Sequence, residues 1–260
     1  MDPALTSPRS AGASADVTSA SSAAGAGTGA RPGRIRDYFE GRAPNWIRLT
    51  SDEPVSGVRR IVREGRDAMA GTLLSWIPGG EGRSVLDAGC GPGEVSLRMA
   101  RRGLTVTGVE IAPTLAASAR ERVEAAGLAG RVTIHEGDAS DAPGGPWQHV
   151  LIMDVLFHYP PGEAIRMLTG FAERADESLL FTLAPRTVLL SVLGGVGVLF
   201  PRRDRAPAIR PVRVGRFLER LLADPGMSGW AVGRQHRVST GFYFSHAVEL
   251  RRTGAGGRRT

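Results

Sequence analysis

The sequence predicts an α/β fold: a mostly parallel seven-stranded sheet with a C-terminal antiparallel hairpin and an N-terminal helical arm. Three observations predict this fold class. Apolar, strand-like runs alternate with helical patterns between residues 85 and 183, as in sheets built from parallel strands and crossover helices. The first run, 85–88, leads directly into a glycine-rich turn at 89–93. Two further strand-like runs, separated by Ser239-Thr240-Gly241, predict the hairpin.

The chain divides into four predicted parts. Residues 1–33 are mostly Ala, Ser, Gly, Thr and Pro, which bury too little apolar surface to offset chain entropy, so we expect a disordered tail. Residues 34–79 form the arm, with a short helix at 35–40, a turn at 44–47 and a long helix at 55–77 that Pro78-Gly79-Gly80 ends. The α/β domain occupies 80–252, and 253–260 form a flexible basic tail.

The elements of the α/β domain follow from hydrophobic periodicity and from turn residues. An apolar run at 188–200 is too short and too glycine-rich for a membrane span. It is expected to wall a large apolar ligand, to touch a membrane or to be a core helix. In chain order we predict strand 85–88, helix 94–102, strand 104–111, helix 112–126, strand 131–135, strand 150–154, helix 162–174, strand 178–183, helix 212–222 and strands 230–238 and 242–250.

The glycine turn is the clearest binding motif. Its three glycines alternate, so one side of the turn lacks Cβ atoms and the backbone can lie against a ligand. The G-x-G-x-x-G dinucleotide fingerprint fails because residue 94 is Glu. An acidic strand residue followed by G-x-G-x-G resembles the S-adenosylmethionine (SAM) loop of Rossmann-like methyltransferases. The predicted SAM-binding residues here are Asp87, Gly89, Cys90, Gly91 and Gly93.

Acidic residues also stand where later strands end, and the carboxyl ends of parallel strands face a ligand crevice. Glu110 lies about 20 residues past the glycine turn, where an acid binds ribose hydroxyls in Rossmann-type sites, and Ile111 follows it. An Asp at the position of Asp138, next to Ala139, faces the adenine amino group in methyltransferases; the alternative is a helix N-cap. Asp154 ends the fourth strand and is expected beside the methyl group.

Charge and cysteine content narrow the functional class. The formal charge is +7, every basic residue is Arg, and residues 201–220 hold seven Arg against two acidic residues. A basic C-terminal half suits anionic substrates or an anionic membrane surface. The single cysteine, Cys90, cannot form an internal disulfide, which fits a reducing cytosol. Cys90 is better explained as a small residue in a tight turn than as a nucleophile, because no base adjoins it in sequence.

Beyond the SAM loop, the sequence resembles the magnesium-protoporphyrin IX methyltransferases of chlorophyll and bacteriochlorophyll synthesis, from about Tyr38 to Leu250. The most discriminating parts are the His-Tyr-Pro segment at 158–160, the loop at 199–207 and Gly-Phe-Tyr at 241–243. Stretches 85–93, 153–159 and 181–187 also carry the resemblance. The arm departs from the plant and cyanobacterial pattern, since Glu40 stands where those enzymes usually have Asn.

The resemblance implies a Rossmann-like class I methyltransferase that moves a methyl group from SAM to the 13-propionate of magnesium protoporphyrin IX. SAM is then the cosubstrate, and magnesium arrives in the porphyrin instead of binding to a metal site of the chain. The family's catalytic and substrate-handling residues match Tyr38 and His158; the alternatives are that Tyr38 packs the arm and His158 caps a loop. A propionate also favours a cation. The candidate arginines are Arg186, Arg202, Arg203 and Arg205.

The resemblance further implies a cytoplasmic enzyme that touches the photosynthetic membrane peripherally and receives its porphyrin from a subunit of magnesium chelatase. We expect no nucleic-acid partner, because the base-flipping motif Asn/Asp-Pro-Pro-Tyr/Phe is missing after the fourth strand. Two rival functions stay open: a class I methyltransferase acting on another small carboxylate or phenol, and a non-catalytic SAM-fold protein that binds pigment. The intact glycine turn, Glu110 and Asp138 favour retained SAM binding over a pure carrier.

Overall fold

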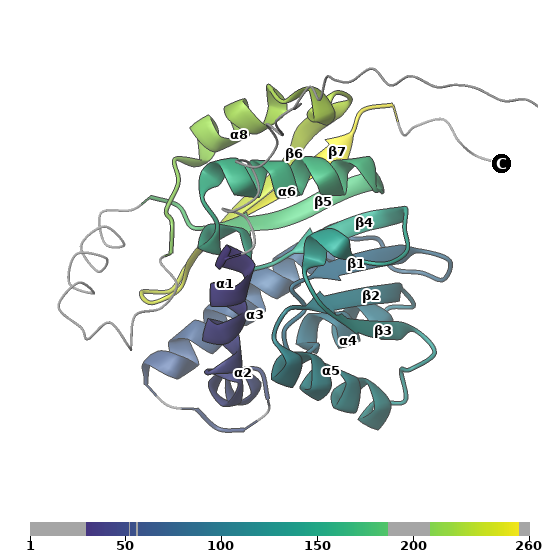
Figure 1. Cartoon of the computed structure of the whole chain (residues 1–260), viewed down its shortest axis with the longest axis vertical. Coiled ribbons are helices and arrows are strands. Elements are labelled where there is room, and N and C mark those ends of the chain that lie inside the picture. Colours follow the sequence, from purple (N-terminus) through teal and green to yellow (C-terminus); the bar gives the residue numbers. More distant parts are fainter. Residues whose placement is uncertain (1–29, 52, 56, 187–208, 255–260) are drawn as a thin grey trace, which may run out of the picture.

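One seven-stranded sheet organises the molecule, as predicted (Figure 1). The computed structural model describes residues 30–51, 53–55, 57–186 and 209–254. The strand order is β3-β2-β1-β4-β5-β7-β6, with parallel pairing from β3 to β5 and antiparallel pairing of β7 with both of its neighbours. The strands are β1 Ser84–Ala88, β2 Thr105–Glu110, β3 Val132–Glu136, β4 Trp147–Ile152, β5 Ala175–Leu183, β6 Trp230–Ser239 and β7 Phe244–Arg252.

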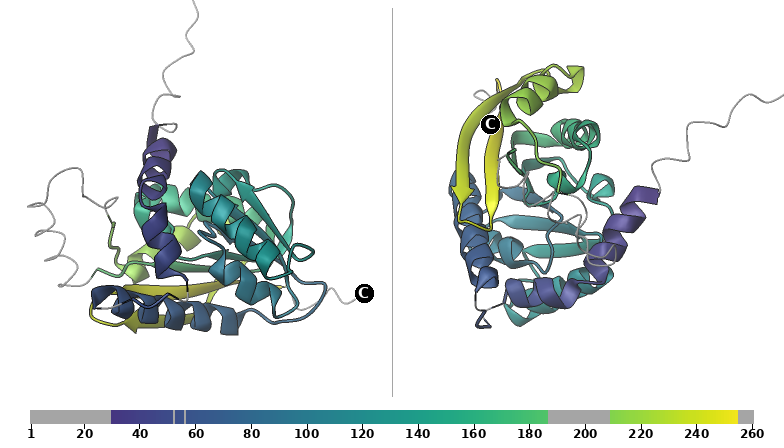
Figure 2. Two further views of the ribbon diagram at one scale, coloured as in Figure 1. Left: turned by 90° about the horizontal axis from the view of Figure 1, so that it is seen from below. Right: turned by 90° about the vertical axis from the view of Figure 1, so that its left-hand side faces the viewer.

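Helices cover both faces of the sheet, and each face has its own hydrophobic core. Successive strand residues point to opposite faces. In β4, for example, Val150 and Ile152 pack with α6 (Pro161–Glu173) and α8 (Val214–Leu222), whereas Leu151 belongs to the core of the other face. That other core includes apolar side chains of α3 (Val58–Trp76), α4 (Glu94–Ala100) and α5 (Pro113–Ala125). Figure 2 shows α3 lying along the underside of the sheet.

The N-terminal arm continues as α1 (Ala30–Glu40) and α2 (Ala43–Leu49), which lie beside α5 (Figure 2). The helix begins at Ala30, so the last residues of the predicted tail 1–33 are helical; residues 1–29 lie outside the described ranges. Glu40 accepts hydrogen bonds from the backbone N–H of Thr114, at 3.0 Å, and from its hydroxyl. Arg122 of α5 donates to the carbonyl of Ile47, at 3.1 Å. The helices α1 and α2 are therefore both tied to α5.

Several element boundaries differ from the predicted ones for local reasons. The fourth strand ends at Ile152, because Asp154 has a left-handed φ of 58° that an extended strand does not allow. The last strand begins at Phe244 instead of 242, since residues 240–243 form a turn in which the N–H of Thr240 donates to the carbonyl of Tyr243 at 3.0 Å. The apolar run predicted at 188–200 lies outside the described residues.

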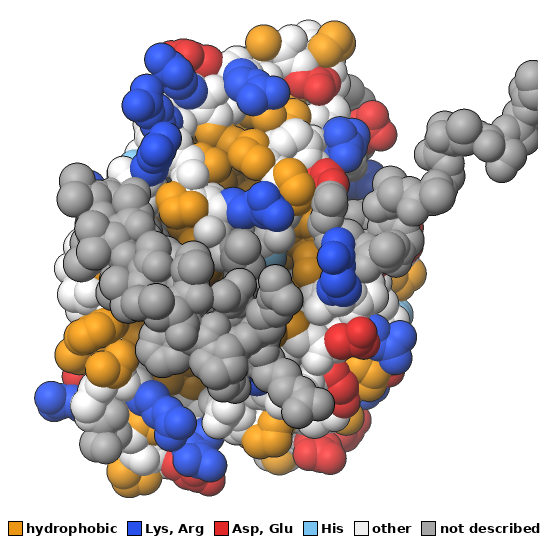
Figure 3. Space-filling model, turned by 60° about the vertical axis from the view of Figure 1, so that its left-hand side comes forward, with side chains coloured by type: hydrophobic (Ala, Val, Ile, Leu, Met, Phe, Trp, Pro, Cys, Tyr) orange, Lys and Arg blue, Asp and Glu red, His pale blue; other side chains and the backbone are white. Residues whose placement is uncertain are grey.

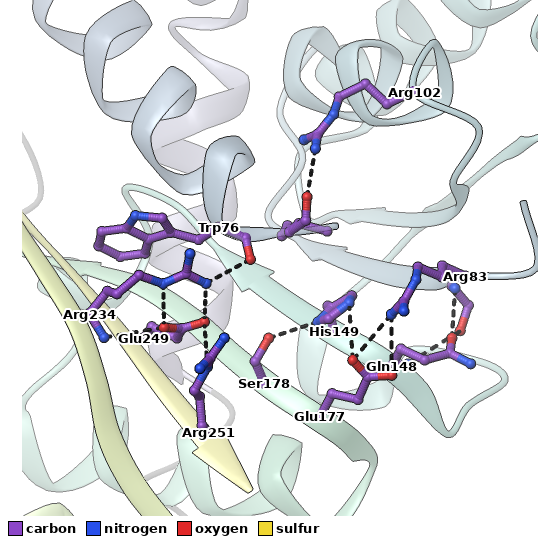
Figure 4. Close-up of polar contacts among 12 residues, drawn as sticks. Trp76, Arg83, Arg102, Gln148, His149, Glu177, Ser178, Arg234, Glu249 and Arg251 are labelled. Carbon is purple, nitrogen blue, oxygen red and sulfur yellow. Dashed lines mark hydrogen bonds and ion pairs between the residues drawn. The ribbon is translucent and has the colours of Figure 1, made fainter. Parts of the chain in front are cut away.

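Polar networks hold the opposite end of the sheet, where the parallel strands begin (Figure 4). Glu249 of β7 is buried and accepts from Arg234 of β6 at 2.6 and 2.7 Å, and Arg234 also donates to the carbonyl of Trp76 at the end of α3. Nearby, His149 Nδ1 lies 2.8 Å from the Ser178 hydroxyl. The contact between Arg234 and Trp76 fastens the hairpin to α3, and the contact between His149 and Ser178 joins β4 to β5. Within the described ranges, no helix combines the length and hydrophobicity needed to cross a membrane.

Candidate active site

A cavity lies where the parallel strands end, between the sheet and the arm. The loops after β1, β2, β3 and β4 each contribute to its wall, as do α1, α2 and α3. This is the position at which open α/β sheets bind their ligands. The side chains and backbone that line the cavity include those of Ile35, Phe39, Trp46, Thr50, Arg66, Gly89, Cys90, Gly91, Glu94, Glu110, Ile111, Gly137, Asp138, Ala139, Asp154, Val155, His158 and Tyr159.

The glycine turn has the backbone conformation that its sequence predicts. Gly89, Gly91 and Gly93 have φ values of 78°, 55° and 80°, which side-chain-bearing residues rarely adopt. A Cβ at Gly89 would lie 2.4 Å from Val155 Cγ2, so this position also requires glycine for packing. A Cβ at Gly91 would meet no atom within 4 Å, because this residue borders the cavity. The turn therefore presents bare backbone to a ligand, which fits a SAM loop.

Glu110 lies where a ribose-binding acid is expected, and it also holds the glycine turn. It is buried, and its two carboxylate oxygens accept from the N–H groups of Gly91 and Ala112, both at 2.9 Å. Burial raises the pKa of Glu110, and the backbone hydrogen bonds oppose this shift. The carboxylate is thus fixed in orientation at the cavity wall, next to Ile111.

Two of the predicted SAM-binding residues are not in the cavity wall. Asp87 is buried behind the turn, where it accepts a hydrogen bond from the Ser96 hydroxyl of α4 at 2.6 Å. Gly93 makes the transition into α4 and lies against Ala119, which a Cβ would approach to 3.1 Å. Cys90 does line the cavity, and burial raises the pKa of its thiol well above the ordinary value, so it is poorly suited to act as a nucleophile.

Asp138 has both of the features that the sequence left open. Its carboxylate accepts from the Ser140 N–H at 2.8 Å and so caps the short 3₁₀ helix η1 (Ala139–Asp141). It also lines the cavity together with Ala139. Tyr159 faces the same region, and burial, with Asp138 and Glu110 nearby, raises the pKa of this phenol to about 12. Tyr159 therefore stays neutral at physiological pH.

The cavity brings together His158 and the arm, but through Phe39 instead of Tyr38. His158 ends the 3₁₀ helix η2 (Leu156–His158), and its ring meets the Phe39 ring edge-on with centroids 5.2 Å apart. Tyr38 is half-buried outside the cavity wall, under the Arg42 guanidinium at 4.3 Å from its ring centroid. Burial raises the pKa of Tyr38, and Arg42 lowers it. In this structure Tyr38 packs the arm.

Among the predicted propionate-binding arginines, Arg186 belongs to the described residues and does not line the cavity. Arg186 is exposed, and its N–H donates to the carbonyl of Val212 at 2.9 Å. Arg202, Arg203 and Arg205 lie outside the described residues.

Arg66, which was not predicted from the sequence, is an arginine that lies in the cavity wall. It extends from α3 and donates to the carboxylate of Asp154 at 2.5 Å. Tyr243, from the turn that precedes β7, donates to the same carboxylate at 3.0 and 3.2 Å. Asp154 and Tyr243 lie in the stretches 153–159 and 241–243, which both carried the family resemblance, and this is the sequence signal that could have directed attention to the partners of Arg66.

Comparison with known proteins identifies the family. The family model described as "Magnesium-protoporphyrin IX methyltransferase C-terminus" matches residues 152–252, and a general methyltransferase domain model matches residues 85–175. The magnesium-protoporphyrin O-methyltransferase of Rhodobacter capsulatus is 39% identical, over 84% of this chain and 95% of that protein. The chain belongs to the magnesium-protoporphyrin O-methyltransferase family.

Solved structures agree with the family and with the predicted Rossmann-like class I methyltransferase fold. The crystal structure of magnesium protoporphyrin IX methyltransferase from Synechocystis PCC 6803 with bound S-adenosylhomocysteine (SAH) superimposes with a TM-score of 0.73. It is 30% identical, and the alignment covers 85% of this chain and 99% of that one. The corresponding sequence from Arabidopsis thaliana is 27% identical over 83% of this chain. Within the described residues, no group of three or more His, Cys, Asp or Glu side chains could hold a metal ion.

Proposed function

We propose that this protein transfers the methyl group of SAM to the 13-propionate carboxylate of magnesium protoporphyrin IX, giving the monomethyl ester and SAH. The observation that carries the proposal is the arrangement within one cavity: the glycine turn and Glu110 on one side, His158 and the aromatic arm on the other. The proposal is supported by the 39% identity to a relative named for this activity, which the chain matches over 95% of its length.

The chemistry requires positioning more than proton transfer. Bound SAM supplies a methyl group on a positively charged sulfur. A carboxylate oxygen forms a bond to that methyl carbon while the carbon–sulfur bond breaks and its electron pair returns to sulfur. No proton moves, because a propionate with a pKa of about 4.3 is already ionised at pH 7. The protein must therefore hold the carboxylate in line with the methyl group and exclude water.

His158 is our candidate for orienting the propionate, and Phe39 for closing the site over it. An imidazole N–H can donate to a carboxylate oxygen, and a protonated ring would add charge to that contact. Phe39, Ile35 and Trp46 give the arm an apolar inner surface that suits a flat macrocycle. Figure 3 shows hydrophobic side chains with arginines around them on the side of the molecule that lies on the left of Figure 1. Arg186 and Arg205 remain our candidates for a propionate contact, and Tyr38 for a role on the arm.

The cofactor contacts are also part of the proposal. Glu110 would bind the ribose hydroxyls, while Asp138 and Ala139 border the adenine. Gly89, Cys90 and Gly91 would pass beneath the sulfur and methionine carbons. Asp87 and Gly93 would act indirectly, by holding the turn and the start of α4.

A radiolabel assay tests the proposed reaction. Full-length protein with labelled SAM is expected to esterify magnesium protoporphyrin. In a separate spectral titration, it should respond less to metal-free protoporphyrin than to magnesium protoporphyrin.

The His158→Ala variant should lower turnover in the radiolabel assay far more than it lowers SAH affinity in a binding titration. The exposed His236→Ala control should leave both quantities unchanged.

Failure to form product with adequate substrate and cofactor would reject the magnesium-porphyrin reaction and favour another carboxylate or phenol acceptor. SAH binding without transfer to any acceptor would favour a pigment-binding protein. If His158→Ala abolishes SAH binding, His158 belongs to the cofactor site instead.

We further propose that the enzyme is cytoplasmic, works at the surface of the photosynthetic membrane and takes its porphyrin from the porphyrin-binding subunit of magnesium chelatase. Two large apolar side chains support a membrane contact: Val58 is 50% exposed at the start of α3, and Phe242 is 53% exposed in the adjoining hairpin turn. The fraction of protein that sediments with vesicles containing anionic lipid should be smaller for Phe242→Ser than for wild type. In a separate assay, porphyrin bound to the chelatase subunit should be methylated faster than free porphyrin. Unchanged sedimentation and equal rates would contradict these two parts.

A further inference from the structure

Arg66 is held firmly, yet it is exposed to the cavity. Its side chain is 15% exposed and that of Asp154 is 7% exposed, and their ion pair spans 2.5 Å. The guanidinium carbon also lies 5.3 Å from the centroid of the Trp46 ring, at the arm. Asp154 contacts one terminal nitrogen, Nη1, whereas a guanidinium carries five N–H donors in a planar fork. Arg66 is thus a preoriented cation with donors beyond the one that Asp154 uses.

Both carboxylate oxygens of Asp154 have hydrogen-bond partners within the protein. One oxygen accepts from Arg66, and both oxygens lie within 3.2 Å of the Tyr243 hydroxyl. Its own N–H donates to the Thr182 hydroxyl of β5 at 2.7 Å, which holds the residue at its left-handed φ of 58°. We predicted a direct SAM contact for Asp154. Its carboxylate instead binds Arg66 and Tyr243, so its role is to position Arg66.

The strand order fixes which end of SAM would reach Arg66. Across the cleft the order is β3, β2, β1, β4, so Asp138, Glu110, the glycine turn and Asp154 follow one another in that sequence. A ribose bound at Glu110 directs the adenine toward β3. The methionine end must then continue past the glycine turn toward β4, where Arg66 lines the cavity beside Asp154.

The chemistry of that end matches an arginine. The methionine portion of SAM ends in an α-carboxylate, which is ionised at pH 7. A guanidinium fork matches the geometry of a carboxylate and can bind both of its oxygens. Besides Asp154, the cavity wall has Glu94 near Arg66. Glu94 is paired with Arg98 at 2.9 Å, which offsets its repulsion of an incoming anion.

We propose that Arg66, positioned by Asp154 and Tyr243, binds the α-carboxylate of the methionine end of SAM. This inference rests on the proposed function only in requiring that the chain uses SAM, and it holds for any acceptor. Tyr243 thereby links the C-terminal hairpin to cofactor binding, which explains how a residue of the family's Gly-Phe-Tyr stretch serves the site without lining the cavity.

The test compares two probes that differ in the methionine end. SAH keeps the amino-acid portion, whereas 5′-methylthioadenosine lacks it. Calorimetric titration of full-length Arg66→Gln is expected to show about a 30-fold weaker SAH affinity than wild type, the usual cost of a lost hydrogen-bonded charge contact. The affinity for 5′-methylthioadenosine should stay within about twofold, since that probe does not reach Arg66.

Three further variants make the test specific. Arg60→Gln, the same substitution on the same helix, removes an exposed guanidinium paired with Glu64 and should change neither affinity. Arg66→Lys should recover part of the SAH affinity, because it keeps the charge and loses the fork. Tyr243→Phe should weaken SAH and spare 5′-methylthioadenosine, as expected for a positioning residue.

Three results would overturn the inference. An equal loss for both probes in Arg66→Gln would mean that the residue only supports the fold, and an unchanged SAH affinity would place the carboxylate elsewhere. No acceptor is present in these titrations, so the outcome is independent of whether magnesium protoporphyrin is the substrate. Wild-type protein that binds neither probe would overturn the use of SAM and this inference together.

Discussion

Asp87 is a buried carboxylic acid whose protonation differs between the folded and unfolded chain. Burial raises its pKa to about 7, although the Ser96 hydroxyl opposes this shift. In an unfolded chain the pKa of Asp is about 3.9. The folded protein therefore binds this proton more tightly. The resulting contribution to stability is complete below about pH 4 and is lost as the pH rises through about 7.

Replacing Asp87 by Asn should remove this pH dependence. The Asn side chain keeps an oxygen that can accept from Ser96 but carries no titrating proton. Relative to Asp87→Asn, the wild-type free energy of unfolding is expected to fall as the pH rises from about 4 to about 7. Urea unfolding at several pH values measures this difference. Glu110 titrates in both proteins and cancels, so parallel curves would show that Asp87 keeps an ordinary pKa.

At the scale of single residues, the sequence predicted what adjacent letters determine. The glycine turn and Glu110 could be predicted because their spacing along the chain is itself the motif, and both line the cavity. Arg66 was not singled out among the several arginines of a long helix, although its spacing from Met69, Ala70 and Leu73 places it on the buried face of that helix. Its partners Asp154 and Tyr243 come from two distant parts of the chain, and only folding brings them together.

At the scale of elements, the contact between α3 and the hairpin depends on a glycine inside a helix. A Cβ at Gly65 would lie 2.7 Å from Thr240 Oγ1 and 2.7 Å from Tyr243 Cδ1. Glycine costs a helix about 1 kcal/mol relative to alanine, so its use here is explained by close approach. A Cβ at Gly71, in the same helix, would have more room, because its nearest neighbour would be the end of the Arg98 side chain, at 3.8 Å.

These two glycines form a matched pair of substitutions. Gly71→Ala is expected to raise the free energy of unfolding by about 1 kcal/mol through helix propensity. Gly65→Ala should lower it by about 1–3 kcal/mol, because the added methyl group pushes the hairpin turn away from the helix. It should also weaken SAH binding, since Tyr243 moves with that turn. Denaturant titrations decide the matter, and equal stabilisation by both substitutions would refute the close approach.

Element types were predictable, and element ends were less so. The alternation of strand and helix patterns predicted the mostly parallel sheet, because parallel strands need crossover connections and these are usually helices. The ends depended on single residues. The left-handed φ of Asp154 stops β4, and Val212 is held by Arg186 and Ala184 before α8 begins at Val214.

At the scale of the whole molecule, the cofactor-binding half of the site could be predicted from the sequence better than the acceptor-binding half. The cofactor half follows from motifs at the ends of β1, β2 and β3. The acceptor half was predicted around Tyr38, His158 and the arginines at 201–209. Of these, the structure places His158 in the cavity, and Phe39 meets it in place of Tyr38. Packing of the arm on α5 decides which of two neighbouring aromatic residues faces inward, and periodicity alone does not.

The link between Arg66 and Tyr243 through Asp154 has a consequence for biosynthesis. Translation delivers α3 before the hairpin, and chains fold from the N-terminal side as they emerge. Until Tyr243 has left the ribosome, β5 lacks its neighbour β7 and presents an unpaired strand edge. Asp154, the partner of Arg66, is then held by Thr182 and not yet by Tyr243. We therefore expect SAM to favour chains whose hairpin has folded over nascent chains that lack it, so that cofactor occupancy marks molecules in which the sheet has formed.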